Sequence, residues 1–171
     1  EAGIPVVSGT TGWLDQIDEI REACKQGHTF FYSSNFSLGV NIFFELSKKL
    51  TQMMNRFPSY NVRMKEVHHT QKMDAPSGTA ITLAEDILEL LDRKTIWVKE
   101  MENSPEELAI ASERTGQVPG FHEVTWDSRV DTITIAHNAK SREGFALGAV
   151  LAAEFTVGKN GFLSMADMLG F

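Results

Sequence analysis

The sequence predicts an α/β protein with two sheets: a parallel sheet of the doubly wound type and a mixed open sheet with helices on one face. Three observations lead to this fold class. A strand, a helix and a strand follow one another over residues 4–32. Strands with alternating apolar residues are grouped between residues 95 and 139. Amphipathic helical patterns lie on either side of a further strand at residues 61–67.

The first of these observations indicates part of a parallel sheet. Residues 4–7 are typical of a short strand of the buried type, and residues 30–32 of a second strand. Between them, apolar residues recur at helical spacing: Leu14, Ile17, Ile20, Ala23 and Cys24. Because parallel strands are joined by a crossover helix, this order predicts a strand–helix–strand unit.

Two longer helices are expected around the strand at residues 61–67. The first has an apolar stripe that we expect to pack in the core. Its members are Ile42, Phe43, Leu46, Leu50, Met53, Met54 and Phe57. The second helix begins after Ser77, a residue that suits the N-cap position. Its apolar face consists of Ala80, Leu83, Ala84, Ile87, Leu88 and Leu91.

The C-terminal half supplies the mixed sheet. Strands are expected at residues 95–98, 107–113, 122–130 and 131–139. Their alternation indicates an open sheet with one face covered by the chain's own helices and the other available to another subunit. Residues 144–157 are apolar nearly all round, which predicts a helix buried between layers. A glycine-bounded turn at residues 158–161 then precedes a short helix at residues 164–169.

Composition excludes several classes of protein. With 16 Lys and Arg against 23 Asp and Glu, the formal net charge is -7 at pH 7, which argues against a nucleic-acid surface. Cys24 is the only cysteine, so no internal disulfide forms and a reducing, cytoplasmic location is expected. The sequence has neither a signal peptide nor an apolar run of membrane-spanning length, so we expect no membrane association.

The residues that carry chemistry are concentrated between positions 66 and 80. This stretch connects a strand to a helix, and such connections commonly display reactive groups. Gly78 and Thr79 follow the N-cap Ser77, so they fall in the first helical turn, where backbone N–H groups favour an anion. Cationic or proton-donating groups lie nearby: His68, His69 and Lys72. An anionic substrate that must accept a proton would suit this set.

The same residues have plainer interpretations. A Pro-Ser-Gly-Thr helix start often serves only as a cap, adjacent strand histidines point to opposite faces, and a single loop lysine is usually solvated. A zinc site that includes His122 and His137 is a further alternative. No Cys-x-x-Cys or His-Glu-x-x-His spacing supports it, so we expect no metal ligands.

Several segments of the chain resemble one enzyme family. They are residues 66–80 (EVHHTQKMDAPSGTA), 7–13 (VSGTTGW), 33–41 (SSNFSLGVN) and 141–149 (SREGFALGA). Their content and order resemble the dihydrodipicolinate reductase family, also called 4-hydroxy-tetrahydrodipicolinate reductase. The resemblance implies an oxidoreductase of lysine and diaminopimelate biosynthesis that uses NADH or NADPH to reduce a small cyclic dicarboxylate. It also implies a Rossmann-type fold for the parallel sheet, and a homo-oligomer, specifically a tetramer.

Residue roles follow from this resemblance. His68 would be the proton donor or acceptor, and Lys72 a second proton donor. The substrate would be held by His69, Gly78 and Thr79. The nicotinamide side of the cofactor would be lined by Gly9, Thr10, Thr11, Ser33, Ser34, Asn35 and Phe36.

The family's pyrophosphate-binding turn, Gly-x-x-Gly-x-x-Gly, does not occur in these 171 residues. We therefore expect the chain to correspond to the C-terminal two thirds of the enzyme and to be inactive by itself. Residues 1–37 would belong to the dinucleotide-binding domain, residues 38–141 would form the substrate and oligomerisation domain, and residues 142–171 would return to the first. The alternatives are a catalytically silent oligomerisation module and a histidine-based metal hydrolase.

Overall fold

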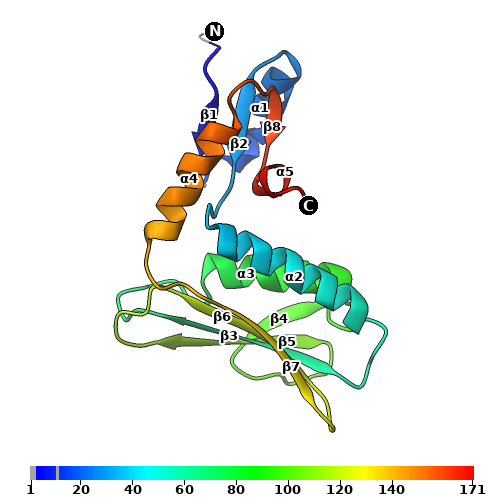
Figure 1. Ribbon diagram of the computed structural model, residues 1–171. Helices are drawn as coiled ribbons and strands as arrows, with labels where there is room; N and C mark the ends of the chain where they lie inside the picture. The colour runs from blue at the N-terminus through cyan, green and yellow to red at the C-terminus, as the bar shows by residue number, and fades with distance from the viewer. Residues whose placement is uncertain (1–2, 11) are drawn as a thin grey trace. The chain divides into compact units, whose positions relative to one another are not determined.

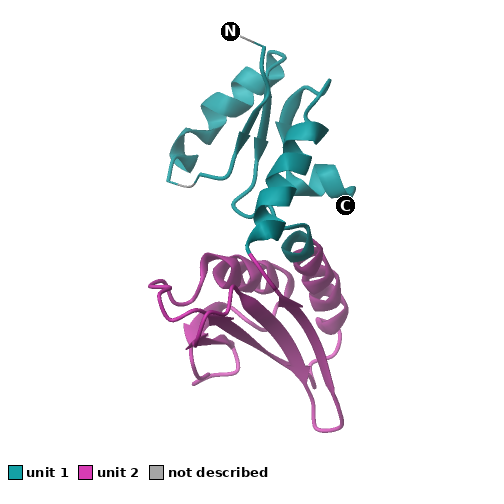
Figure 2. Ribbon diagram, turned by 60° about the vertical axis from the view of Figure 1, so that its left-hand side comes forward, with its two compact units in different colours: residues 1–41, 142–171 teal, residues 42–141 magenta. Residues whose placement is uncertain are grey.

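The computed structural model describes residues 3–10 and 12–171. The chain divides into two compact units (Figure 2): unit 1 comprises residues 1–41 and 142–171, and unit 2 comprises residues 42–141. The sequence-based boundary before residue 38 lies slightly earlier than the first division. Within the described residues, no helix is long and apolar enough to span a membrane.

Unit 1 contains a small parallel sheet. Its elements are β1 (Val6–Ser8), the 3-10 helix η1 (Leu14–Gln16), α1 (Ile17–Lys25), β2 (Thr29–Tyr32), α4 (Glu143–Phe155), β8 (Gly161–Leu163) and α5 (Met165–Leu169) (Figure 1). The strand order is β1-β2-β8, and both pairs are parallel, which confirms the predicted strand–helix–strand unit. The expected turn between Gly158 and Gly161 leads into β8, a strand that the sequence analysis did not predict. A strand as short as β8 shows no alternation in sequence.

Unit 2 contains the predicted mixed sheet. Its elements are β3 (Asn61–His68), α3 (Gly78–Leu90), β4 (Ile96–Lys99), β5 (Glu107–Arg114), β6 (Phe121–Asp127) and β7 (Thr132–Asn138), while α2 (Leu38–Met54) spans the division between the units. The strand order is β4-β5-β3-β6-β7, in which β4, β5 and β3 are parallel and β6 and β7 are antiparallel. Helices α2 and α3 cover one face of this sheet (Figure 1).

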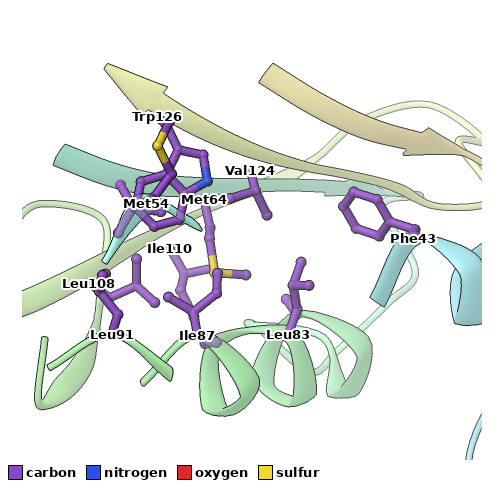
Figure 3. Packing of buried hydrophobic residues seen from close by; sticks show 13 residues of the cluster. Phe43, Met54, Met64, Leu83, Ile87, Leu91, Leu108, Ile110, Val124 and Trp126 are labelled. Atoms are coloured by element: carbon purple, nitrogen blue, oxygen red, sulfur yellow. The ribbon is translucent and has the colours of Figure 1, made fainter. Parts of the chain in front are cut away.

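The core of unit 2 lies between these helices and the sheet. Side chains from the strands point toward those of α2 and α3 (Figure 3). Its buried members are Phe43, Met54, Val62, Met64, Ala80, Leu83, Ala84, Ile87, Leu91, Leu108, Ile110, Val124 and Trp126. Burying one large apolar side chain contributes about 1.5–3 kcal/mol. This layer therefore fixes the helices to the sheet. The apolar residues recur at the helical period of about 3.6 residues in the helices and at the period of about 2 in the strands, which predicts such packing.

The predicted apolar stripe of α2 is only partly buried. Phe43 and Met54 belong to the core. Between 45% and 63% of the surface is exposed at four other members of the stripe: Ile42, Leu46, Met53 and Phe57. The expectation that the whole stripe packs in the core is therefore wrong. The exposed Ile42, Leu46 and Met53 each lie one position before a buried residue, so they share a side of α2 next to the one that the sheet covers. The buried residues are Phe43, Ser47 and Met54.

Two segments of unit 1 are also more exposed than predicted. Among the described residues of α4, only Gly148 and Ala152 are buried, whereas Leu147 and Val150 are 54% and 55% exposed. The expected burial of this helix between layers is wrong, because it packs along one side only, against β1 and α5. The strand expected at residues 4–7 begins at Val6, which is exposed, while Val7 and Ser8 are half-buried. Among the described residues, β1 pairs only with β2.

Candidate active site

The buried face of β3 changes from apolar to polar toward the end of the strand. Met64 belongs to the core, and by strand alternation Glu66 and His68 face the same side. The register places Glu66 opposite His122 of β6, and His68 beside Arg114 of β5. A cluster of titratable side chains therefore lies at the carboxyl end of β3, directly beside the apolar core.

Glu66 is at the centre of this cluster, and its side chain is 0% exposed. Its Oε1 accepts hydrogen bonds from Arg114 Nη2 at 2.8 Å and from the Ser77 amide at 3.3 Å. Its Oε2 is hydrogen-bonded to His68 Nδ1. A carboxylate buried without partners would be costly, so these donors are what allow Glu66 to remain inside the protein.

The charge of Glu66 follows from these contacts. Burial alone would raise the pKa of this carboxyl group, but hydrogen bonds from His68 and Arg114 outweigh it and lower the pKa of Glu66 to about 2. Glu66 is therefore ionised at neutral pH. An ionised carboxylate can only accept hydrogen bonds, so Nδ1 of His68 carries the hydrogen of the bond that joins them.

His122 lies beside His68 and is kept neutral. The two rings meet edge to face with their centroids 5.1 Å apart. Burial, together with the neighbouring His68, lowers the pKa of His122 to about 4. Its Nε2 lies 3.1 Å from Ser77 Oγ, which also accepts the Ala80 amide at 3.2 Å. The hydroxyl hydrogen of Ser77 is thus available to His122 Nε2.

The connection after β3 is fastened to the sheet at two points. Arg114 Nη2 donates to the Asp74 carbonyl at 2.6 Å, so one guanidinium nitrogen contacts both the connection and Glu66. The Thr70 amide donates to the Gly116 carbonyl at 3.3 Å. These bonds hold the connection over the end of the strands, where the buried cluster lies.

The two other proton-bearing residues predicted for the site lie in this connection. Lys72 Nζ is 2.8 Å from Asp74 Oδ1, and this hydrogen bond is the largest cause that lowers the pKa of Asp74. His69 is half-buried just beyond the end of β3, and its carbonyl accepts the Lys72 amide at 3.1 Å. Lys72 and His69 therefore follow the buried His68 within a single turn.

The start of α3 has the geometry that the sequence predicts. Ser77 is the N-cap, with an extended backbone (ψ 154) and a side-chain oxygen that accepts the Ala80 amide. Gly78 and Thr79 form the first turn. Gly78 is exposed, and a Cβ placed on it would meet no atom within 4 Å. An anion can therefore approach the positive end of the helix closely at this point.

Unit 1 holds the residues predicted to line the cofactor. Gly9 and Thr10 directly follow β1, and both are exposed; Thr11 lies outside the described residues. A Cβ on Gly9 would meet Phe36 Cε2 at 3.0 Å, and a Cβ on Gly148 would lie 1.7 Å from the Phe36 carbonyl oxygen. The absence of side chains at these two glycines therefore allows Phe36 to pack between the end of β1 and α4.

The segment after β2 is a turn fixed by its own polar side chains. Ser33 Oγ donates to the Asn35 carbonyl at 2.6 Å, and the Ser37 amide donates to Asn35 Oδ1 at 2.9 Å. Asn41 Nδ2 also donates to the Asn35 carbonyl, at 2.8 Å. Ser34 is exposed within this turn. Because β1 and β2 are parallel neighbours, Gly9 and Ser33 follow the carboxyl ends of adjacent strands.

Glu66, His68 and His122 also approach the geometry of a metal site, because their ligand atoms lie within 4.8 Å of one another. The acceptor atoms of Glu66 and His122 already have donors, however. Glu66 accepts from Arg114, His68 and the Ser77 amide, and His122 Nε2 lies within hydrogen-bonding distance of the Ser77 hydroxyl. A guanidinium beside the carboxylate also opposes a bound cation. The cluster suits a hydrogen-bonded network, and the expected lack of metal ligands remains a prediction.

Glu66 and Arg114 were not predicted as members of the site. Glu66 did leave a signal in the sequence, since it is a charged residue on the apolar side of an alternating strand, two positions before His68. Arg114 left none, because it reaches Glu66 across 48 positions of sequence through the pairing of β3 with β5.

Comparison with known proteins places the chain in a family. Residues 39–169 match the family model described as "Dihydrodipicolinate reductase, C-terminus". Three relatives are named 4-hydroxy-tetrahydrodipicolinate reductase. The protein of Christiangramia forsetii is 53% identical over 97% of this chain and 70% of its own length. The protein of Caldanaerobacter subterraneus is 37% identical over 97% of this chain and 67% of its own length. The protein of Aquifex aeolicus is 38% identical over 96% of this chain and 63% of its own length.

A solved structure shares the fold. It is the dipicolinate-bound dihydrodipicolinate reductase from Paenisporosarcina sp. TG-14, with a TM-score of 0.73 and 22% identity over 94% of this chain and 63% of that one. The chain thus spans about two thirds of the length of the proteins that it matches. The family model covers most of the chain, and the predicted resemblance is confirmed: the chain belongs to the dihydrodipicolinate reductase family, in the C-terminal part that the family model describes.

Proposed function

We propose that this chain carries the substrate-binding and proton-transferring part of a 4-hydroxy-tetrahydrodipicolinate reductase, an oxidoreductase of lysine and diaminopimelate biosynthesis. The names of the relatives support this activity. The observation that carries the proposal is the placement of His68. Its ring is buried at the end of β3, Glu66 holds one of its nitrogens, and the anion-binding start of α3 follows the next connection.

The proposed substrate is a small cyclic dicarboxylate, and the site offers positive groups for its charges. Gly78 and Thr79 present the positive end of α3 to one carboxylate. Lys72 supplies a cation in the connection, and it would exchange Asp74 for a carboxylate of the substrate. In the sequence, His69 directly follows β3 and precedes Lys72 and the start of α3. We propose that it holds the substrate.

The proposed chemistry places proton donors in unit 2. Reduction of a C=C or C=N bond adds hydride to one atom and a proton to its neighbour. His68 would release the proton, and Lys72 would act as the second donor. General acid catalysis of this kind commonly contributes about 10²–10⁴-fold to the rate.

Hydride is supplied by NADH or NADPH when the cofactor is bound. Gly9, Thr10 and Thr11, with residues 33–36, are proposed to hold its nicotinamide side. Two features support this role: these loops follow the carboxyl ends of parallel neighbouring strands, and the turn at residues 33–36 is fixed by its own hydrogen bonds.

The pyrophosphate-binding turn does not occur in these 171 residues. We therefore expect this chain by itself to bind NADH weakly or not at all, and micromolar affinity in a calorimetric titration would contradict that.

The activity is tested with the full-length reductase and 4-hydroxy-tetrahydrodipicolinate as substrate. The expected result is oxidation of NADH or NADPH that depends on both substrates and is inhibited by pyridine-2,6-dicarboxylate. Absence of turnover with either nucleotide would contradict the proposed function. Metal analysis of the same preparation tests the rival metal hydrolase, which requires a stoichiometric metal ion.

A homotetramer is proposed as the assembly. Helices α2 and α3 cover one face of the unit 2 sheet, and the opposite face carries short polar side chains such as Thr125 and Thr134, whose hydroxyl oxygens are 3.3 Å apart. Such a face can pack against another copy. Light scattering gives the assembly size, and an NADH titration of the same sample distinguishes an enzyme from a silent oligomerisation module. A cytoplasmic location and the lack of nucleic-acid or membrane partners remain predictions.

A further inference from the structure

The contacts of His68 and Glu66 have a consequence for the direction of proton transfer. Nδ1 of His68 is hydrogen-bonded to the Glu66 carboxylate, and only Nε2 remains to exchange a proton with a ligand. We propose that Glu66 is the positioning residue of the reaction: it fixes the tautomer and the orientation of His68, so that Nε2 is the atom that gives the proton to the substrate. This inference rests on the proposed function only for the identity of the proton acceptor.

The proton balance of the step is simple. The imidazolium of His68 carries hydrogen on both nitrogens. The Nε2–H bond breaks, and the proton passes to the substrate atom next to the one that accepts hydride. His68 is left as a neutral ring with its hydrogen on Nδ1, facing the Glu66 carboxylate. Glu66 remains an anion throughout and keeps the ring in one orientation, in the way that a buried carboxylate orients a catalytic histidine in other enzymes.

Three contacts hold the anion in place. Arg114 Nη2 and the Ser77 amide both donate to Oε1 of Glu66, which leaves Oε2 for His68. The same network lowers the pKa of Glu66 to about 2, against the effect of burial. Because the donors are divided between the two oxygens, the carboxylate cannot rotate without losing several hydrogen bonds at once.

Gly120 lies next to the other nitrogen of His68. A Cβ placed on Gly120 would lie 3.2 Å from His68 Nε2, so a larger residue at this position would crowd the nitrogen. His122 contacts His68 through the edge of its ring and is itself neutral. Because His122 is uncharged at neutral pH, it does not repel the imidazolium form of His68.

The matched replacement is Glu66→Gln, which keeps the size of the side chain and removes its charge. In this variant the amide oxygen must take the place of Oε1, because Arg114 and the Ser77 amide both donate there. The amide NH₂ group then occupies the place of Oε2 and donates to His68 Nδ1. The neutral ring is forced into the opposite tautomer, with its hydrogen on Nε2.

The experiment combines nitrogen-15 NMR of the histidine rings with steady-state kinetics of the full-length reductase. In the wild type, the neutral His68 ring should carry its hydrogen on Nδ1; in Glu66→Gln it should carry it on Nε2. Turnover of the variant should fall about 10²-fold or more while KM changes less than about threefold. The control is Glu102→Gln, which removes a carboxylate that accepts from Lys94 and Asn61 in the same unit. It should lower the melting temperature but leave the His68 tautomer and turnover unchanged.

The outcomes separate the two proposals. A wild-type His68 ring with its hydrogen on Nε2 overturns the inference, whether or not the variant folds. A folded Glu66→Gln protein with near wild-type turnover also overturns it. A wild-type reductase without activity refutes the proposed function instead, and the NMR result then still decides whether Glu66 sets the tautomer.

Discussion

Two carboxylates, Glu66 and Glu102, contact opposite ends of β3 and are bound in similar ways. Glu66 lies at the carboxyl end of the strand and accepts from a guanidinium and a backbone amide. Glu102 accepts from Asn61, the first residue of β3, at 2.9 Å and from Lys94 at 3.0 Å. Lys94 is almost completely buried, so each end of the strand has one buried charge paired with its opposite.

The difference between the two ends lies in the third partner. Glu102 completes its set with the Ala109 amide at 3.4 Å, a group that cannot change its protonation. Glu66 completes its set with His68, whose second nitrogen is still available for proton exchange. In the proposed mechanism, the same kind of ion pair serves only to fasten a loop at one end of the strand, while at the other it also positions the proton donor.

The largest expected effect is the loss of turnover when residues near the Glu66 end of β3 are replaced. In the full-length reductase, His68→Ala and Lys72→Ala should each reduce kcat by about 10²–10⁴-fold, because each removes a proton donor. Lys72→Ala should also raise KM, since the lysine is opposite in charge to the substrate carboxylates. His69→Ala should act mainly on KM. Steady-state kinetics of each variant measures kcat and KM.

Melting temperatures measured beside the kinetics provide the control for that prediction. If all three variants lost stability instead of rate, the residues would serve the strand end and not the reaction. Near wild-type turnover in a stable Lys72→Ala protein would remove the lysine from the mechanism and leave His68 as the sole proton donor.

The next largest effect is on stability at the Glu102 end. Lys94→Met should cost about 3 kcal/mol in the free energy of unfolding, because it leaves Glu102 without its cation. Urea unfolding of this chain measures the cost. Lys49→Met is the matched control, since the exposed Lys49 forms a pair with the half-buried Glu45 one helical turn away, and this pair should contribute less than about 0.5 kcal/mol. A loss of turnover in the full-length Lys94→Met protein would show that both ends of β3 serve the reaction.

A smaller effect on the stability of the folded protein is expected as pH falls. It arises at the end of β3 that carries Glu66 and His68. The pKa of His122 is 6.5 when unfolded and about 4 when folded, so between these values the unfolded chain binds the additional proton and stability decreases as pH falls. The loss is at most about 3 kcal/mol and levels off below pH 4, where the folded protein is also protonated. Glu66 adds a further loss between pH 4.5 and about 2, where this carboxyl group is protonated in the unfolded chain but still ionised in the folded protein.

The control for this pH dependence is His122→Gln, which should flatten the decrease between pH 6.5 and 4 in a series of urea titrations. Other charged or titratable groups act on His122 and remain in this variant: His68, Glu66, His137 and Lys72. An unchanged slope would mean that these neighbours, and not His122, determine the pH dependence.

The smallest effect on stability is expected at the start of α3. Gly78→Ala should alter the free energy of unfolding by less than about 1 kcal/mol, because a Cβ there meets no neighbouring atom and Ala favours a helix. Affinity for pyridine-2,6-dicarboxylate should nevertheless fall in the full-length reductase, since the methyl group crowds the anion. Thr79→Val should weaken binding as well if its hydroxyl contacts the ligand. Unchanged affinity in both variants would show that this helix start is only a cap.

The sequence by itself determined where the elements of unit 2 lie and, in three of them, the side that is buried. In β3, β6 and α3 the hydrophobic period matches the local geometry, so burial follows from spacing alone. Ser77 was predictable as a cap for the same reason, because capping involves residues only a few positions apart. His68 and Lys72 were identified by a motif within one short stretch of chain.

Only the tertiary structure decided which polar groups act together. Arg114 and His122 reach the cluster through the pairing of β3 with β5 and β6, and the spacing of residues in sequence does not encode that register. Tertiary packing also decided how much of an apolar helix is covered, which is why the stripes of α2 and α4 were predicted to be more buried than they are. A period shows which face of an element is apolar, whereas the partner that covers the face is set by contacts between distant segments.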